Sequence, residues 1–383
     1  MQETKVKIVG LGGAGCRIVD RLSGTTSRPA ALVAVHTDVA TLDPCLAPTK
    51  VQIGETLTRG FGTGGDADTG RRAALEDKEM LRALFNQVRL VLLVGGLGGG
   101  TASGAAPALM EAAKEEGAMV MAFVTLPFAF EGPRRMVRAR QALETLRPLA
   151  DALVILPNER LAAMADQARV AQTFRSINTV LAEAMHGVER LLCEPGLIQL
   201  DFADLQRLFN RHGGACTLAY GEGQGDGKAR QALDALLGSP LLEGGRILAG
   251  AHAVLLGIAG GEDMTLKEVG DIAQEISSRV GADGTVRIGT AIQEDARRKI
   301  ALTALVSDSG QTRGSARTGS DDPAARMADG ASAVARRPQA LQTRLKLEVT
   351  GKGRFKDVEP TVHEGQDLDV PTFMRRGIVI AKG

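Results

Sequence analysis

Short apolar runs that alternate with amphipathic helical segments fill the first half of this 383-residue chain. The runs are continuously rich in Val, Ile and Leu, and they occur at 5–9, 31–38, 90–96, 118–128 and 152–158. A strand that is apolar on both sides is buried on both sides, which is typical of a parallel sheet covered by helices. The sequence therefore predicts an α/β domain with a parallel sheet over residues 1–169.

A long helix and a second domain are predicted to follow. Apolar residues recur at three- and four-residue steps from Val170 to Leu192, which indicates a central helix over 170–195. Residues 196–309 contain the apolar run 245–261, a helical pattern from Leu266 to Val280, and strand-like runs at 285–292 and 299–308. This mixture predicts a smaller α+β domain.

The chain changes character after Ser309. Residues 310–343 have no aromatic residue and no sustained apolar period, so we expect a disordered linker of mixed charge. The tail, 344–383, again holds apolar and charged clusters. Two interpretations of the tail are equally compatible with its composition: a tethered recognition motif that orders when bound, or a strand that returns to the core.

Charge and composition exclude several function classes. Lys and Arg total 46 against 45 Asp and Glu, and aromatic residues make up 3%, which argues against nucleic acid as a partner. The longest apolar stretch, 117–130, is too short to span a bilayer, and the first ten residues lack a secretory pattern. We expect a cytoplasmic protein without direct membrane insertion. The four Cys and five His show no metal-binding spacing, so no protein metal site is expected.

Glycine is the outlier in the composition. Its 47 residues are about 12% of the 383, whereas its usual share is about 7%. One glycine loop, Gly10–Gly15, follows the first strand and precedes a helix expected to begin near Cys16. It fits G-x-G-x-x-G, and Asp38 closes the next strand, as in a dinucleotide site. A second loop, Gly95–Gly104, follows the run at 90–96 and precedes a helix expected from about Ala105.

Two such turns on one parallel sheet can hold one polyphosphate from two sides through backbone N–H groups and helix N-termini. A nucleoside triphosphate fits this arrangement better than a dinucleotide, which makes a Rossmann dehydrogenase the weaker alternative. The sequence contains no G-x-x-x-x-G-K-[ST], so a Walker P-loop is excluded.

The segment GGLGGGTASGAAP resembles the GGGTGTG signature of the tubulin/FtsZ family of GTPases, and the FtsZ branch is the closer one. Further segments resemble that branch in the same order: QIGETLTRGFGTGGDADTGRRAA, TLPFAFEGPRRM, ILPNERL, EPGLIQLDFADL, SPLLEG, GIAGGEDMTLKEV and LDVPTFMRR. The resemblance covers nearly all of the chain except the linker. It implies a tubulin/FtsZ-like fold and a GTPase that polymerises head to tail into filaments at the division site.

The resemblance also implies residues that bind GTP or GDP, with Mg²⁺ as the default cation. The phosphate-binding residues would be Gly12, Gly13, Gly15, Gly62, Thr63, Gly64, Gly65, Gly98, Gly99, Gly100, Thr101, Ala102, Ser103 and Gly104. Asp38, at the spacing of a ribose-binding acid, is a further candidate for nucleotide binding. The ribose would contact Glu131, with Arg135 four residues on. The guanine base would contact Asn158, Phe174 and the position of Thr179.

Catalysis is implied for Asp201 and Asp204, with Gln199 at a position where the family has Asn. The two carboxylates are three residues apart, so on a helix they would share a face and orient a water for attack on the γ-phosphate. The resemblance implies that they complete the active site of the neighbouring subunit. An isolated pair of this kind is more often explained by the favourable helix dipole.

Several residues depart from the family pattern. Cys16 and Arg17 replace Asn or Gly, and His36 replaces Asn. Ala102 stands where the family has glycine, and we expect it to restrict a backbone position that needs a positive φ. Thr179 replaces a carboxylate that accepts from guanine, so we expect guanine specificity to be weaker than triphosphate binding. Together with Gln199, these changes keep open a structural filament protein or paralogue that hydrolyses little GTP.

The tail sequence DVPTFMRR resembles the family's C-terminal peptide, which docks on membrane-anchoring division proteins. The resemblance implies that Asp369, Pro371, Phe373 and Arg375 contact such an anchor.

Overall fold

The structure is a computed structural model that describes residues 6–24, 31–163, 169–193, 196–200, 205, 215–293, 296–308, 362–363 and 366–367. The chain divides into two units, Met1–Ala316 and Arg317–Gly383. In the second unit the described residues form one antiparallel pair, β11 (Val362–His363) with β12 (Gln366–Asp367). The expected linker, 310–343, and the tail residues Asp369, Pro371, Phe373 and Arg375 lie outside the described residues.

A single ten-stranded sheet runs through the first unit in the order β3-β2-β1-β4-β5-β6-β7-β10-β8-β9. Its pairs are parallel except for those that β10 makes with β7 and β8. The strands are β1 (Val6–Leu11), β2 (Leu32–His36), β3 (Thr49–Gln52), β4 (Leu90–Gly96), β5 (Met119–Leu126), β6 (Ala152–Pro157), β7 (Ala215–Gln224), β8 (Ala251–Gly260), β9 (Thr285–Ile292) and β10 (Lys299–Asp308).

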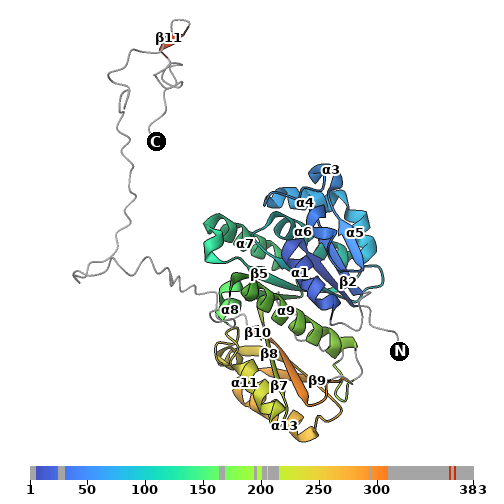
Figure 1. Cartoon of the computed structure of the whole chain (residues 1–383), viewed down its shortest axis with the longest axis vertical. Helices are drawn as coiled ribbons and strands as arrows, with labels where there is room; N and C mark the ends of the chain where they lie inside the picture. The colour runs from blue at the N-terminus through green and yellow to red at the C-terminus, as the bar shows by residue number, and fades with distance from the viewer. Residues whose placement is uncertain are drawn as a thin grey trace, which may run out of the picture. The chain divides into compact units, whose positions relative to one another are not determined.

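Helices cover both faces of this sheet (Figure 1). The helices that precede β7 in the chain are α1 (Gly12–Ser23), α2 (Val39–Leu42), α3 (Glu55–Thr58), α4 (Ala67–Glu76), α5 (Lys78–Leu84), α6 (Gly100–Glu115), α7 (Pro133–Leu146), α8 (Asn158–Ala162) and α9 (Val170–Cys193). Those after it are α11 (Lys228–Leu237), α12 (Arg246–Ala249) and α13 (Leu266–Arg279).

Neighbouring residues of one strand enter different cores, which explains why the strands are apolar throughout. Ile8 packs with α1 and α9 on one face of the sheet, and Val9 packs with α4, α5, α6 and α7 on the other. Both side chains have no exposed surface. Continuous apolar runs therefore indicate burial on both faces, as the sequence predicts.

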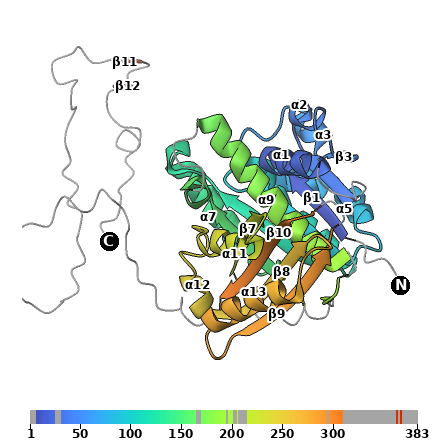
Figure 2. The ribbon, with the colours of Figure 1, turned by 60° about the horizontal axis from the view of Figure 1, so that its bottom comes forward.

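Helix α9 joins the two halves of the sheet. Its residues Leu181, Met185 and Val188 share one buried cluster with strands of the first half and with Leu218 of β7 and Leu305 of β10. Figures 1 and 2 both show α9 lying beside α1. The opposite face of β7, β8 and β10 is covered by α11, α12 and α13 in a separate cluster.

These observations confirm the α/β fold class, the mostly parallel sheet, the long central helix and the second α+β part. The expected starts of two helices are wrong: α1 begins at Gly12 rather than near Cys16, and α6 begins at Gly100 rather than near Ala105. Glycine has low helix propensity, but here the close approach of neighbouring elements outweighs that preference.

Strand β7 and helix α11 are not predicted from the sequence. Gly221 and Gly223 interrupt the apolar run of β7, and the packing of α11 explains both. A Cβ on Gly221 would lie 2.4 Å from the backbone nitrogen of Leu236, and one on Gly223 would lie 2.1 Å from the carbonyl oxygen of Lys228. Glycine thus lets α11 pack directly on the strand.

Candidate functional site

A cavity of about 560 Å³ opens where β1 and β4 end and where α1 and α6 begin. Its lining residues are Gly12, Gly13, Ala14, Arg17, Ile18, His36, Asp38, Phe61, Gly62, Thr63, Gly64, Gly65, Gly96, Leu97, Gly98, Gly99, Gly100, Thr101, Ala102, Thr125, Pro127, Glu131, Arg135, Arg138, Asn158, Phe174, Ile177 and Asn178. The carboxyl ends of parallel strands are the usual place for ligands in such folds.

The first glycine turn divides its residues between the cavity and the core. Gly12 has φ +71° and lines the cavity together with Gly13. Gly15 lies behind them, where a Cβ would come within 2.5 Å of the carbonyl oxygen of Val94. Gly15 therefore allows α1 to pack closely against β4, and it does not line the cavity.

A side chain of the second glycine turn, that of Ser103, accepts a hydrogen bond from the backbone of the same turn. Gly98 has φ +92°, and its backbone N–H donates to the Ser103 hydroxyl at 2.8 Å. Gly99 precedes the first turn of α6 and has no side-chain cap for that helix, so backbone N–H groups at this end face the cavity region without a side-chain acceptor. Ala102 lies inside α6 and does not have a positive φ, so the expected restriction there is wrong.

Neighbouring loops fix the second turn in place. The hydroxyls of Thr101 and Thr37 lie 2.7 Å apart, which joins α6 to the end of β2. A Cβ on Gly100 would lie 2.1 Å from the Thr63 hydroxyl, so the loop of Gly62 to Gly65 packs directly on the start of α6. The Arg138 guanidinium donates to the carbonyl oxygen of Gly65 and brings a positive charge to the cavity wall.

His36 and Asp38 line the cavity, and the His36 ring lies near Gly13 of the first glycine turn. The Asp38 N–H donates to His36 Nδ1 at 2.9 Å, so the proton of the neutral ring is on Nε2, the nitrogen nearer Gly13. Burial lowers the pKa of His36, although the Asp38 carboxylate opposes this effect. The Asp38 carboxylate caps α2 by accepting from Ala40 N at 3.0 Å, and it also accepts from the Thr41 hydroxyl at 2.7 Å.

Glu131 and Arg135 lie on the cavity wall and pair with each other. Glu131 Oε2 is 2.7 Å from Arg135 Nη1, and Glu131 Oε1 accepts from the N–H of Phe128 at 2.8 Å. A Cβ on Gly98 would contact Arg135 at 2.7 Å. The two side chains therefore fix the loop after β5 next to the second glycine turn.

Aromatic and amide side chains form the other end of the cavity. Phe174 meets Phe128 edge to face, with ring centroids 5.4 Å apart. Asn158, at the start of α8, is buried, and Asn178 lies one helical turn after Phe174 on α9. An aromatic face with two amides suits a planar, polar-edged ligand.

Most of the residues expected at a nucleotide site lie together in this cavity, and four of them do not. Gly15, Ser103, Gly104 and Thr179 are absent from its lining. The Thr179 hydroxyl accepts from Arg21 Nε at 3.1 Å, on the side of α9 that faces α1. Gln199 is described and exposed, whereas Asp201 and Asp204 lie outside the described residues.

Sequence reasoning missed Asn178 and Arg138 as cavity residues. The helical period gave the signal for Asn178, because a residue four positions after Phe174 lies on the same helix face. Arg138 lies five residues after Pro133, the first residue of α7, and nothing in its local sequence indicates that it reaches back to Gly65.

Cys16, Cys45 and Cys216 are buried, Cys193 is half-buried, and none of the four lines the cavity. Burial raises the pKa of the Cys16 thiol to about 12, and the nearby Cys45 thiol adds to this effect. Within the described ranges, no three His, Cys, Asp or Glu side chains come together as metal ligands. Nor does any helix described there have the length and hydropathy needed to cross a membrane.

The fold and the cavity define a class: α/β proteins in which glycine turns after parallel strands face a nucleotide-sized cavity. Comparison with protein families then identifies the chain. The model described as "Tubulin/FtsZ family, GTPase domain" matches residues 5–166, and "FtsZ family, C-terminal domain" matches residues 214–310. The chain belongs to the tubulin/FtsZ family.

Curated relatives agree with this assignment. The "Cell division protein FtsZ" of Aquifex aeolicus is 34% identical over 305 residues, which cover 79% of this chain and 83% of that protein. The "Cell division protein FtsZ 1" of Methanocaldococcus jannaschii is 36% identical over 308 residues, covering 80% and 84%.

Solved structures show the same fold. An empty FtsZ dimer of M. jannaschii matches with a TM-score of 0.74 and 35% identity, over 80% of this chain and 88% of that one. GDP-bound CetZ1 of Haloferax volcanii matches with a TM-score of 0.67 and 23% identity, over 81% and 96%, which shows the fold alone.

Proposed function

We propose that this chain binds and hydrolyses GTP and polymerises head to tail into cytoskeletal filaments at the cytoplasmic division site. The observation that carries the proposal is the cavity itself, in which two glycine turns and the starts of α1 and α6 face one space. Membership of the tubulin/FtsZ family supports GTP as the ligand, and the relatives named for cell division support the cellular role.

The phosphates would be bound mainly by backbone. N–H groups of the turns at Gly12–Gly13 and Gly98–Gly100, together with two helix N-termini, would interact with the phosphate oxygens. Arg17 and Arg138 add positive charge on the cavity wall. A Mg²⁺ ion bound together with the nucleotide would offset further phosphate charge, with phosphate oxygens and water as most of its ligands.

Hydrolysis would need a second subunit. Asp201 and Asp204 of the adjacent subunit would orient and polarise the attacking water, and Gln199 would assist in positioning it. Exposed apolar side chains support such a contact at both ends: Phe61 and Phe130 beside the cavity are 87% and 76% exposed, and Leu197 near the acidic segment is 75% exposed. A heterologous contact between two different faces generates an open filament when its rotation does not close.

Gln199 favours a second candidate, a filament protein that binds GTP but hydrolyses little of it. Its amide is on a longer stem than the Asn of the family, and small displacements of positioning groups slow catalysis. For the tail we propose that Asp369, Pro371, Phe373 and Arg375 dock on a membrane-anchoring division protein. Deleting residues 365–383 would then abolish anchor binding while filaments persist.

One experiment tests the main proposal. The purified full chain is mixed with GTP, ATP or NAD, and light scattering and phosphate release are followed together. Scattering with phosphate release on GTP supports the proposal, and scattering without release supports the second candidate. Binding of NAD with neither signal would contradict both.

A further inference from the structure

One cation of the cavity wall has incomplete hydrogen bonding. Arg138 lies on α7, lines the cavity and is half-buried. A terminal nitrogen of its guanidinium donates to the carbonyl oxygen of Gly65. Its Nε is buried and has no hydrogen-bond partner among the described residues. A buried donor of this kind is costly unless a ligand or water completes its hydrogen bond.

The other two cations that line the cavity are in a different condition. Arg135 is paired with Glu131 at 2.7 Å, and Arg17 is exposed to solvent. Within the part of the chain that the structure describes, no carboxylate forms an ion pair with Arg138. The Asp66 carboxylate of the neighbouring loop is used to cap α4, where it accepts from two backbone N–H groups. A half-buried guanidinium without a counter-charge favours the binding of an anion beside it.

The contacts of this wall follow one direction along the cavity. The ring of Phe128, before α7, belongs to the aromatic end. Arg135 lies at the second glycine turn, where a Cβ on Gly98 would contact it at 2.7 Å. Arg138 lies one helical turn further on the same face and reaches Gly65. A nucleotide whose base lies at the aromatic end would therefore meet Arg138 with its last phosphate.

Gly65 gives the guanidinium its place at the loop. Its φ is +82°, and a Cβ there would lie 3.2 Å from Arg138 Nη1, so a larger residue would crowd the guanidinium. The bond to the Gly65 carbonyl uses one donor of a guanidinium that carries several. Arg138 can therefore hold the loop and bind a ligand at the same time.

We propose that Arg138 binds the terminal phosphate of a nucleoside triphosphate and thereby sets the preference for GTP over GDP, an inference that rests on the proposed function. Charge-assisted hydrogen bonds from a guanidinium to phosphate oxygens are stronger than neutral ones, and GDP lacks the phosphate that would accept them. Because the same guanidinium donates to the Gly65 carbonyl, the bound phosphate also stabilises the position of this loop.

Equilibrium binding of GDP and of a non-hydrolysable GTP analogue to the purified full chain, below the concentration at which it assembles, tests this proposal. Arg138→Gln keeps an N–H donor for the Gly65 carbonyl and removes the charge. We expect it to weaken binding of the analogue by about tenfold or more and to change the Kd of GDP by less than about twofold. Arg138→Lys keeps the charge and should lose less affinity for the analogue than Arg138→Gln does.

Arg140→Gln is the matched control. It makes the same change of charge on the same helix, at an exposed side chain that does not line the cavity. Both Kd values should stay unchanged in this variant. Retained binding of GDP shows in each case that the variant is folded.

The outcomes are distinguishable. The inference is overturned, and the proposed function left standing, if Arg138→Gln weakens the binding of both nucleotides equally or changes neither. It is also overturned if Arg140→Gln produces the same selective loss. Equal losses in Arg138→Gln and Arg138→Lys would contradict it too, because the charge would then have no effect on binding. If the unmodified chain binds neither nucleotide, the proposed function itself fails.

Discussion

Single glycines of the same loop serve two different purposes. Gly99 lines the cavity, has an ordinary φ of −83°, and would place a Cβ in open space. Gly104, five residues later in α6, would place a Cβ 2.0 Å from the carbonyl oxygen of Ala67 in α4. Gly99 is therefore free for ligand binding, and Gly104 is required for helix packing.

Gly99→Asp is expected to abolish nucleotide binding without loss of stability. Asp is a favourable residue at the position before a helix, so the fold should tolerate it. Its carboxylate would lie where phosphate oxygens are proposed to bind, and repulsion should weaken GTP affinity by at least about 100-fold. Titration with a fluorescent GTP analogue and thermal unfolding measure the two effects. Retained affinity would show that the phosphates do not bind at this turn.

Gly104→Ala should have the opposite effect. Alanine in a helix interior gains about 1 kcal/mol over glycine from propensity, but a contact of 2.0 Å to backbone forces α4 and α6 apart. Overpacking of this kind costs about 1–3 kcal/mol, so the net change should be destabilising. Urea unfolding gives the sign, and a more stable variant would contradict the packing role.

At the same scale, the sequence predicts kinds of residues better than their positions. Glycine turns, Glu131 and Phe174 can be placed at the cavity from motif resemblance. Thr179 cannot, because a shift of one residue turns a helical side chain by 100°, and Asn178 lines the cavity where Thr179 does not.

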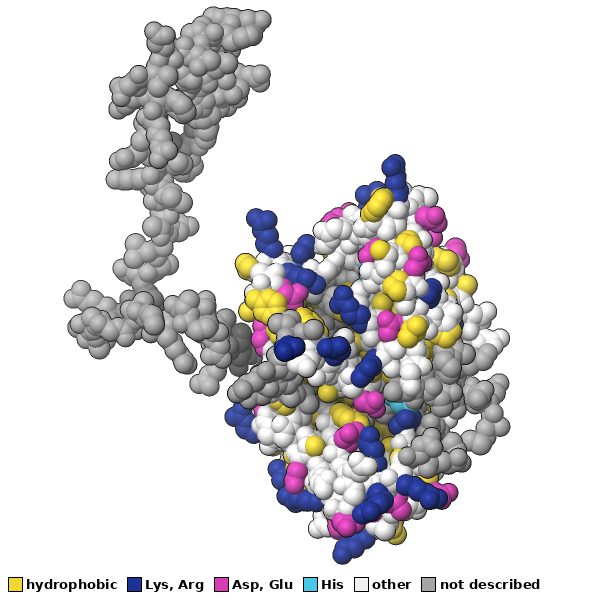
Figure 3. Space-filling view, in the orientation of Figure 1, with side chains coloured by type: hydrophobic (Ala, Val, Ile, Leu, Met, Phe, Trp, Pro, Cys, Tyr) yellow, Lys and Arg dark blue, Asp and Glu magenta, His cyan; other side chains and the backbone are white. Residues whose placement is uncertain are grey.

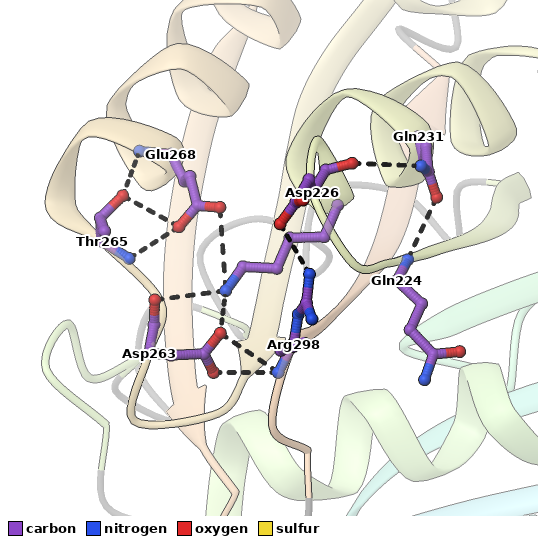
Figure 4. Close-up of polar contacts among 8 residues, drawn as sticks. Gln224, Asp226, Gln231, Asp263, Thr265, Glu268 and Arg298 are labelled. Carbon is purple, nitrogen blue, oxygen red and sulfur yellow. Dashed lines mark hydrogen bonds and ion pairs between the residues drawn. The ribbon is translucent and has the colours of Figure 1, made fainter.

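At the scale of elements, a buried lysine ties together the second half of the sheet. Lys228 begins α11 and is 5% exposed. Its ammonium binds the Asp263 carboxylate, donates to the Asp263 carbonyl oxygen at 3.2 Å, and lies 3.8 Å from Glu268 of α13. Figure 4 shows Asp263 also accepting from the Arg298 backbone, beside the Thr265–Glu268 capping box.

Lys228→Met should lower the Tm by about 3–8 °C, because it leaves two carboxylates without their buried cation while keeping the side-chain volume. Arg230→Ala is the matched control from the same helix. It removes an exposed i,i+4 pair with Asp234, and such pairs contribute about 0.3–0.5 kcal/mol. If the two substitutions lowered the Tm equally, the contacts of Lys228 with Asp263 and Glu268 would not stabilise the fold more than an exposed ion pair does.

The pH dependence follows from the same contact. The bond from Lys228, with a smaller contribution from the Arg298 N–H, lowers the pKa of Asp263 below its ordinary 3.8. A lowered carboxyl pKa stabilises the fold above the unfolded value, and this stabilisation is lost as the pH falls through the folded value. The Tm difference between the unmodified chain and Lys228→Met should therefore be full above about pH 5 and shrink as the pH falls through 3.8 towards the folded value.

Which elements the sequence predicts also has a physical reason. Strands buried on both faces and the long α9 give uninterrupted patterns, and they can be predicted. Strand β7 is interrupted by Gly221 and Gly223, which are there because α11 packs against them, and that cause is visible only in the tertiary structure.

At the scale of the whole molecule, positive and negative charges nearly balance. The chain carries a net charge of +1, and Figure 3 shows Lys and Arg interspersed with Asp and Glu on the face in view. Self-association through exposed apolar residues near two different sites fits such a surface better than a polyanion partner does. If nucleotide and acidic residues come from different subunits, neither site is complete in one chain.

Mixing two inactive variants tests this directly. Asp204→Ala would bind GTP but lack the acidic group, and Gly99→Asp would keep the acidic group but lack GTP. Each should be inactive alone. In an equal mixture, a GTP-bearing Asp204→Ala subunit meets an intact acidic segment at about a quarter of random head-to-tail contacts, so up to about a quarter of the unmodified turnover should return.

Phosphate release at constant total protein measures this recovery, and sedimentation shows whether the two variants assemble together. Dilution should remove the recovered activity faster than linearly, because it depends on contacts between subunits. A mixture that co-assembles and stays as inactive as its components would contradict the composite site. Full activity of Asp204→Ala alone would do the same, since one chain would then hold everything that hydrolysis requires.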